Sequence, residues 1–154
     1  MVSCSKYLKW YEGEKSPFLI YSSADKHFNE FINKQDKLEW LDEFFIHNNI
    51  LCGVLDFAKV EKGKVVEFIE CKVRTHNNID WKVVLQVLFY ETITKCENWR
   101  IIVYNRKYNY LPYEYSRNEV LTKYKYLWDL AQKHLKFIYN NYEQLNKIIY
   151  NEGH

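Results

Sequence analysis

The sequence predicts a mixed α/β domain built around a small central sheet with helices flanking it, and three observations lead to this fold class. Two apolar runs, Ile50–Val60 and Val65–Val73, flank a Glu-Lys-Gly-Lys turn, which is the pattern of an antiparallel hairpin. After the hairpin, helical patterns alternate with a third strand at Arg100–Tyr104. The chain of 154 residues has only 4 Gly and 2 Pro, enough for one domain with short connections.

The first 35 or so residues are predicted to be mostly helical, with a break at Ser16-Pro17. Ser22 or Ser23 can cap a helix from about Ala24 to Gln35, whose apolar residues share one face. The next pattern, LEWLDEFFI at 38–46, fits a helix or a strand, and the sequence leaves this choice open.

The predicted hairpin begins after a tight turn at Asn48-Asn49. Its two strands are Ile50–Val60 and Val65–Val73, and Gly63 between them tolerates the positive φ that a short hairpin turn requires. The second strand therefore returns antiparallel to the first.

The rest of the chain is predicted to be mainly helical. Asp80 can cap a helix from about Trp81 to Lys95, and Leu111-Pro112 indicates a loop after the third strand. Apolar residues then recur at helical spacing from about Asn118 to Asn141 or beyond. We expect a single domain over residues 1–154, with its core at about 38–105 and a C-terminal helix at about 118–146.

The composition argues against several classes of protein. A net charge of +2 provides no polybasic tail, and the four cysteines form no CxxC pair or zinc-finger spacing. No apolar stretch approaches the roughly 20 residues of a membrane span, and the N-terminus lacks the apolar core of a signal peptide. We therefore expect an intracellular protein with reduced thiols and no membrane partner. Aromatic residues make up 18 %, which suits stacking on unpaired bases but also fits AT-rich codon usage.

The hairpin brings three charged residues together. Glu70 and Lys72 are two residues apart on one strand, so they share a face. Asp56 and Glu70 are equidistant from Gly63, so antiparallel pairing brings them alongside each other. Two carboxylates suit Mg²⁺ or Mn²⁺, and a neighbouring lysine can orient a nucleophile; the alternative is an ordinary ion pair on an edge strand.

The following helix carries two further polar groups. Gln86 and Tyr90 are four residues apart on a helix that is otherwise apolar, so they share one face. A glutamine on such a helix needs a partner, and a strand-end carboxylate or a nucleic-acid phosphate would serve. The alternative is that Gln86 lies on a solvent-facing stripe.

These three segments resemble a known family. The motifs G-V-L-D at 53–56, I-E-C-K at 69–72 and Q-V-L-F-Y at 86–90 are similar to those of the RecB-like branch of the PD-(D/E)xK nucleases, in the same order and with similar spacing. The resemblance covers about residues 43–105. It implies a restriction-endonuclease-like core, but the chain is short for such an enzyme and lacks the iron–sulfur cysteines of part of that branch.

The resemblance implies a role for each matching residue. Asp56 and Glu70 would bind Mg²⁺ or Mn²⁺ together with the carbonyl of Cys71, and Lys72 would assist the attacking water. Gln86 and Tyr90 would support the site or hold the nucleic acid. His27 is the best match by placement for a metal-ligating histidine of the N-terminal helix, and Glu43 for an acid that some members carry before the Asp strand.

Two loops are candidates for contact with the substrate. Arg106 and Lys107 alternate with tyrosines, including Tyr108 and Tyr110, and this combination suits phosphate contact and base stacking. A packed aromatic loop over the sheet edge is the equal alternative. The loop at 75–80 follows Lys72 directly, so its His76 and Asn77 are further candidates.

The sequence therefore predicts a metal-dependent deoxyribonuclease that acts on single- or double-stranded DNA. The rival is a catalytically silent nucleic-acid-binding or assembly protein on the same fold, and a third candidate is a phosphodiesterase of small nucleotides. Strand preference, exo- or endonuclease mode and DNA versus RNA stay open, as does dimerisation, which is common among nucleases of this size. Small size and AT-rich composition fit a viral or plasmid gene, with the product in the cytoplasm.

Overall fold

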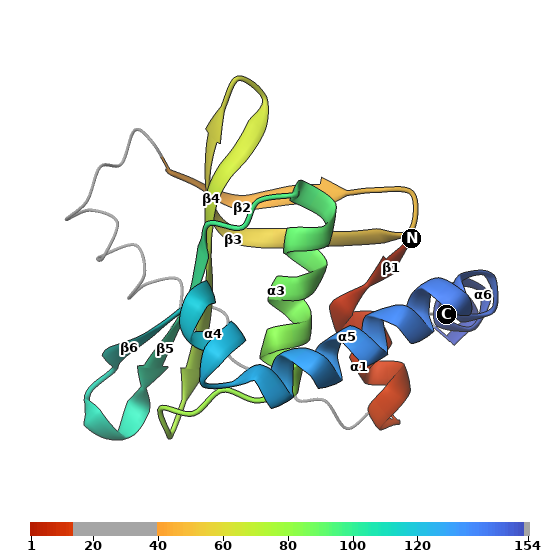
Figure 1. The fold of residues 1–154 in the computed structure, drawn as a ribbon. Coiled ribbons are helices and arrows are strands. Elements are labelled where there is room, and N and C mark those ends of the chain that lie inside the picture. The colour runs from red at the N-terminus through yellow and green to blue at the C-terminus, as the bar shows by residue number, and fades with distance from the viewer. Residues whose placement is uncertain (14–39, 153–154) are drawn as a thin grey trace.

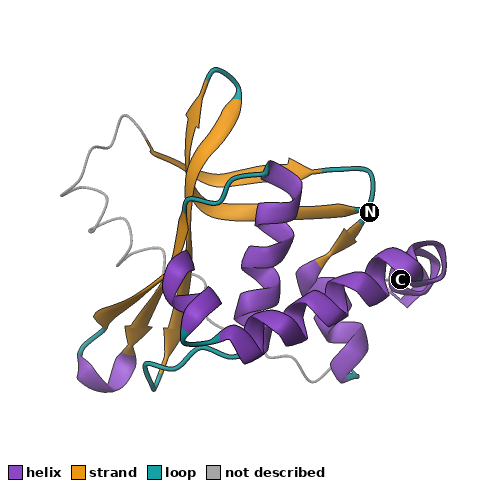
Figure 2. Ribbon diagram, viewed as in Figure 1, coloured by secondary structure: helices purple, strands orange, loops and turns teal. Residues whose placement is uncertain are grey.

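The structure is a computed structural model that describes residues 1–13 and 40–152. These residues form a mixed sheet with helices gathered on one side of it, as Figure 1 and Figure 2 show. The predicted class, a mixed α/β domain with a small central sheet, is confirmed. None of the helices in the described ranges is long and apolar enough to cross a membrane.

The sheet has six strands: β1 (Val2–Ser3), β2 (Trp40–His47), β3 (Leu51–Glu61), β4 (Lys64–Arg74), β5 (Trp99–Asn105) and β6 (Leu111–Ser116). The strand order is β1-β3-β4-β5-β6, and β2 pairs with β3 in addition. The β1–β3 and β4–β5 pairs are parallel, and the β2–β3, β3–β4 and β5–β6 pairs are antiparallel.

The helical segments are α1 (Cys4–Glu12), α3 (Trp81–Thr94), the short 3-10 helix η1 (Arg106–Tyr108), α4 (Arg117–Thr122), α5 (Lys125–Asn140) and α6 (Tyr142–Glu152). Asp80 caps α3 as predicted, since its Oδ1 accepts hydrogen bonds from the N–H groups of Lys82 and Val83. Helix α3 lies between the sheet and α5, so most of its surface is buried and its sequence is apolar nearly all round.

The β3–β4 hairpin differs from a simple two-residue hairpin by one residue. Lys62 and Gly63 form the turn with φ of 51° and 76°, the positive values of a type I′ turn. The Val60–Val65 pair is followed by a Lys59–Glu67 pair, so Val66 is an extra residue, a β-bulge. The bulge shifts the register by one position, and continuation past the Phe57–Ile69 pair then sets Asp56 opposite Glu70.

One edge of β3 is open in its middle. Strand β1 pairs with Leu51 and Cys52, and β4 pairs with β3 only from Phe57 onward. Between these two contacts this edge of β3 has no paired strand, and Gly53, Val54 and Asp56 line a cavity there, whereas residues 53–55 pair with β2 on the other edge. The open edge places Asp56 at the point where three elements, β1, β3 and β4, surround one space.

Side chains on β4 alternate between two cores. Phe68 packs in the larger core with α3 and the other helices, whereas Ile69, Cys71 and Val73 pack in a smaller core on the other face of the sheet. Glu70 therefore points to the same face as Phe68, toward α3. This alternation decides that a charged residue is buried on the helix side of the sheet.

Six rings form what we call the aromatic cluster, where α1 meets α3 and α5. Its members are Tyr7, Trp10, Tyr11, Trp81, His134 and Phe137. The Trp81 and His134 rings stack with centroids 4.2 Å apart, and the Tyr7 hydroxyl lies 2.6 Å from Nδ1 of His134. All of these rings except Trp81 line a small open apolar cavity of about 250 Å³, together with Leu130 and Lys133.

Three predicted elements need correction or completion. The segment that contains Leu111-Pro112 is not a loop but strand β6, because Pro is tolerated on an edge strand that pairs on one side only. The single helix predicted from 118 is three helices, since the backbone leaves the helical region at Tyr124 and Asn141. The open choice at 38–46 is resolved for residues 40–47 as strand β2. The helix predicted at 24–35 lies outside the described residues.

Candidate active site

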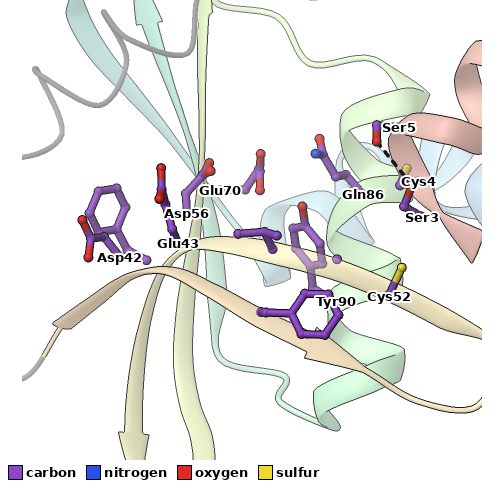
Figure 3. Close-up of a pocket in the computed structure, with 14 residues that line it drawn as sticks. Ser3, Cys4, Ser5, Asp42, Glu43, Cys52, Asp56, Glu70, Gln86 and Tyr90 are labelled. Atoms are coloured by element: carbon purple, nitrogen blue, oxygen red, sulfur yellow. Dashed lines mark hydrogen bonds between the residues drawn. The ribbon is translucent and has the colours of Figure 1, made fainter. Parts of the chain in front are cut away.

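A cavity of about 640 Å³ opens where β3, β4, α3 and the beginning of α1 meet. In the view of Figure 3, acidic side chains gather at one end of it, Ser3 to Ser5 lie at the other end, and Gln86 lies between the two. Asp56, Glu70, Gln86 and Tyr90, four of the residues predicted from the sequence, all line this cavity.

The centre of the site is a group that we call the carboxylate site: Asp56, Glu70 and Lys72. Oε1 of Glu70 lies 3.1 Å from Nζ of Lys72, so the two side chains share a face of β4 as expected and form an ion pair, on an inner strand rather than on the edge strand of the alternative. The N–H of Cys71 donates to Oδ2 of Asp56 at 2.8 Å, which fixes that carboxylate across the gap between the strands. Glu70 is only 2 % exposed, and its Oε2 is buried without a hydrogen-bond partner among the described residues.

Burial and the neighbouring acid both act on Asp56. Burial raises the pKa of Asp56 well above its ordinary value, and the charge of Glu70 raises it further, against the opposing effects of the Cys71 N–H and Lys72. The two carboxyl groups are within hydrogen-bonding reach of each other. Two carboxylate oxygens are both acceptors, so a proton or a cation is needed between them.

Gly53 and Tyr90 connect the first and third sequence motifs. A Cβ at Gly53 would lie 2.7 Å from Cε1 of Tyr90, so only glycine allows this ring to pack against β3. Burial, followed by the charges of Glu70 and Asp56, raises the pKa of Tyr90 well above its ordinary value, while a side-chain hydrogen bond with Gln86 lowers it in part. The tyrosine is therefore a neutral hydroxyl beside the two acids.

Glu43 extends the acidic end of the cavity. It lies between the Asp42–Phe57 and Phe44–Leu55 pairs of β2 and β3, in register with Asp56, and it lines the cavity with Asp42. Its φ of 48° is in the left-handed region, which is uncommon for a residue other than glycine. Backbone strain of this kind is found preferentially at functional sites.

One part of the cavity, formed by Ser3, Ser5 and Phe45, was not predicted from the sequence. Ser3 caps α1, because its Oγ accepts a hydrogen bond from the N–H of Lys6. The signal was present: a serine directly before an apolar helical run is an N-cap pattern. Phe45, on β2, is 56 % exposed at the cavity, and nothing in its neighbours along the chain marks it.

The residues of the carboxylate site fit a divalent metal. Mg²⁺ is commonly bound by one or two carboxylates with several waters, and the orphaned Oε2 of Glu70 beside Asp56 is a ready oxygen ligand. Within residues 1–13 and 40–152, however, no three His, Cys, Asp or Glu side chains are close enough to hold a metal ion as a group. The remaining predicted ligand, His27, lies outside the described residues.

The predicted contact loops are placed apart from the cavity lining. Arg106, Lys107 and Tyr108 form the exposed η1 turn between β5 and β6, while Tyr110 is half-buried against the smaller core. In the 75–80 loop, Asn77 has a structural role: its side chain accepts from Asn105, and its backbone carbonyl accepts from the Tyr115 hydroxyl. His76 is exposed, and its Nδ1 accepts from the N–H of Asn78.

No family model matches the chain, and no curated protein sequence matches it. A solved structure titled "Crystal structure of SSO0001" is similar, with a TM-score of 0.46 and 13 % identity over 84 % of this chain and 75 % of that one.

Proposed function

We propose that this protein is a metal-dependent nuclease that hydrolyses phosphodiester bonds of DNA. The observation that carries the proposal is Glu70, a buried carboxylate with one oxygen paired to Lys72 at 3.1 Å and the other unpartnered beside Asp56. A buried charge without a full set of partners is destabilising, and sites that do chemistry are where such arrangements are found. The resemblance of the three motifs to the RecB-like nucleases supports the same function.

Each residue has a chemical task in this proposal. Asp56 and Glu70, with the carbonyl of Cys71, would hold one or two Mg²⁺ or Mn²⁺ ions. A bound ion of this kind supplies a water of lowered pKa and positive charge for a phosphoryl oxygen. Lys72 fixes the orientation of Glu70, and its ammonium group offsets negative charge that develops on the phosphate. Tyr90 and Gln86 close the site on the helix side.

Cleavage of labelled single- and double-stranded DNA in Mg²⁺, Mn²⁺ or EDTA tests the proposal. We expect metal-dependent cutting that falls at least about a hundredfold in Glu70→Gln, because a metal ligand is lost. Glu67→Gln is a matched control: Glu67 is on the same strand and lies 3.9 Å from Lys59, but away from the cavity lining. Cutting by Glu70→Gln at the rate of the Glu67→Gln control would overturn the proposal.

The rival function is nucleic-acid binding or assembly without catalysis, and the exposed η1 turn with Arg106, Lys107 and Tyr108 favours it. A pure binder would bind DNA equally in EDTA and in Mg²⁺ and would be unaffected by Glu70→Gln. A nuclease would keep binding in Lys72→Met while losing cleavage. Activity on a cyclic dinucleotide with none on polymer would instead indicate a phosphodiesterase of small nucleotides.

A further inference from the structure

Helix α5 carries two apolar stripes, one buried and one exposed. The buried stripe faces α3 and the rest of the core, and it consists of Leu127, Trp128, Ala131 and Ile138. The exposed stripe, which we call the α5 stripe, recurs at spacings of four, three and four residues and consists of Tyr126, Leu130, Lys133 and Phe137. Tyr126 is 69 % exposed, Leu130 38 % and Phe137 42 %. A helix that packs on a core with one side normally turns polar residues to water on the other, so a second apolar stripe indicates a partner surface.

The two ends of the α5 stripe have complementary shapes. At its C-terminal end, Leu130, Lys133 and Phe137 line the open apolar cavity of about 250 Å³ that α5 shares with α1. The wall of this cavity is aromatic, since the Phe137 ring stacks on Trp10 with the centroids 6.2 Å apart. At the other end, Tyr126 lies outside the cavity lining, with its ring exposed. An apolar cavity of about 150 Å³ already holds benzene, so this one has room for a tyrosine ring.

These two ends fit each other when a second copy of the chain is added. Tyr126 and Phe137 are 11 residues apart, which is about 16 Å along α5. The spacing of the stripe reads the same in both directions, so a two-fold axis between Leu130 and Lys133 exchanges its ends. A second α5 that runs antiparallel across this axis brings each Tyr126 to the Phe137 of the other copy, at the cavity. Two-fold interfaces need a self-complementary surface of this kind, and side chains set into facing holes are the packing of paired helices.

The charges beside the α5 stripe favour the same arrangement. Asp129 and Lys136 are exposed on one flank of the stripe, and the exposed Lys133 lies in the stripe itself. Because the axis crosses α5 between residues 130 and 133, Asp129 of one copy lies opposite the turn of the other that contains Lys133 and Lys136. Opposite charges therefore meet on both sides of the axis. They fix the register of the pair, whereas a parallel pair would set Asp129 against Asp129.

We infer that this protein forms a two-fold symmetric homodimer through the α5 stripe, in which Tyr126 of each copy inserts into the ring-lined cavity of the other. The partner is thus a second copy of this chain. The inference goes beyond the proposed nuclease function and does not depend on it. A tyrosine suits this role, because it buries a large apolar ring at a low cost in side-chain entropy and keeps a polar hydroxyl at the interface.

Sedimentation velocity of the full chain, from about 1 to 200 µM, tests the inference. We expect wild-type protein to be mainly dimeric at the upper concentration, since an interface of two helices is at the small end of the range for specific complexes. Tyr126→Glu should raise the dissociation constant of the dimer about 100-fold or more, because both copies lose an aromatic anchor. The fold is retained in this variant, since position 126 is exposed in the first turn of α5, where an acid is favourable.

Two further variants at exposed positions of α5 serve as controls. Gln132→Glu adds the same charge outside the α5 stripe, so the dissociation constant should change less than about threefold. Tyr126→Phe keeps the ring that fills the cavity, and its dissociation constant should also stay within about threefold of wild type.

An exchange of charges tests the antiparallel register. Asp129→Lys sets lysines against lysines in the dimer, so its dissociation constant should rise about tenfold or more. A variant with both Lys133→Asp and Lys136→Asp sets acids against acids and should weaken by a similar factor. An equimolar mixture of the two variants should form a heterodimer at wild-type concentrations, because each lysine then faces an acid.

Three results would overturn the inference. Wild-type protein that is monomeric at about 200 µM would leave the cavity to another occupant. Dimerisation of Tyr126→Glu as readily as Gln132→Glu would show that any dimer forms through a different surface. A mixture of the two charge variants that stays monomeric would contradict the antiparallel pairing. Cleavage of DNA is a separate measurement, so none of these results decides the nuclease proposal.

Discussion

The aromatic cluster and the carboxylate site are two regions that are built on opposite physical terms. In the aromatic cluster the Tyr7 hydroxyl and the His134 ring are hydrogen-bonded to each other, and the Trp81 ring stacks on His134. In the carboxylate site two acids lie within reach of each other and Glu70 keeps an oxygen without a partner. From this difference we expect the aromatic cluster to stabilise the fold and the carboxylate site, without a cation, to reduce the stability of the fold. Substitutions in the aromatic cluster should therefore lower the free energy of unfolding, and substitutions in the carboxylate site should raise it.

The largest expected effect is in the aromatic cluster. Tyr7 is 1 % exposed, and Tyr7→Ala removes a buried ring and the partner of His134. We expect the free energy of unfolding to fall by about 3–5 kcal/mol, measured by urea denaturation. Tyr11→Ala, on the same helix but 53 % exposed, should lose much less. Equal losses of unfolding free energy in Tyr7→Ala and Tyr11→Ala would contradict a stabilising role for the buried part of the aromatic cluster.

The next largest effect tests the close packing of Gly53 against the Tyr90 ring, which connects the first and third sequence motifs. Gly53→Ala forces a Cβ to within 2.7 Å of the Tyr90 ring, and overpacking of this kind costs about 1–3 kcal/mol. The loss should be smaller in a Tyr90→Ala background, because the clash is then absent. A double-mutant cycle of unfolding free energies measures this coupling, and additive losses would contradict the close packing.

A substitution in the carboxylate site should change stability in the opposite direction. Because the pKa of Asp56 is raised in the folded protein, its ionised form opposes folding at every pH above its ordinary pKa. Asp56→Asn should therefore raise the free energy of unfolding at pH 7 in EDTA, by about 1 kcal/mol. The gain should fade as the pH falls toward 4, where the wild-type carboxyl binds a proton.

The control for this gain is Asp42→Asn, because Asp42 is an exposed acid at the edge of the same cavity. It should change stability by less than about 0.5 kcal/mol. Wild-type protein that is more stable than Asp56→Asn in EDTA would show that the acid pair stabilises the fold.

The smallest effect is the response of the aromatic cluster to pH. Burial lowers the pKa of His134, so the unfolded chain takes up the proton first as the pH falls below 6.5. Stability should decline from pH 7 to pH 5 by less than about 1 kcal/mol, since the ring is only partly buried. Thermal melts across this range should show a shallower decline in His134→Gln, and an identical slope would remove His134 as the cause.

The sequence was informative about the carboxylate site because the motifs are local. Glu70 and Lys72 share a face through the two-residue period of a strand, and Asp80 and Gly63 are cap and turn residues with local signals. The opposition of Asp56 and Glu70 was predicted from symmetry about Gly63. In the structure, the same opposition results from a two-residue turn together with a bulge at Val66. The bulge depends on packing, and no local sequence pattern predicts it.

Other features depend on contacts between distant segments and could not be read from the sequence. Strand β6 forms because β5 offers a free edge, which outweighs the turn signal of Leu111-Pro112. The apolar period that predicted one long helix continues across the breaks at Tyr124 and Asn141. The approach of Ser3 and Ser5 to the acids requires the parallel pairing of β1 with β3, which joins residues about 50 positions apart.

The central claim, that the carboxylate site is destabilising until it holds a cation, is tested most directly by thermal melts with and without Mn²⁺. Wild-type protein should gain roughly 5–10 °C in Tm at saturating Mn²⁺, as expected for a ligand at about a hundred times its Kd. Glu70→Gln should gain little, and the matched Glu67→Gln should gain as much as wild type. If Mn²⁺ leaves the Tm of wild type unchanged, or raises all three equally, the pair of acids does not bind a metal.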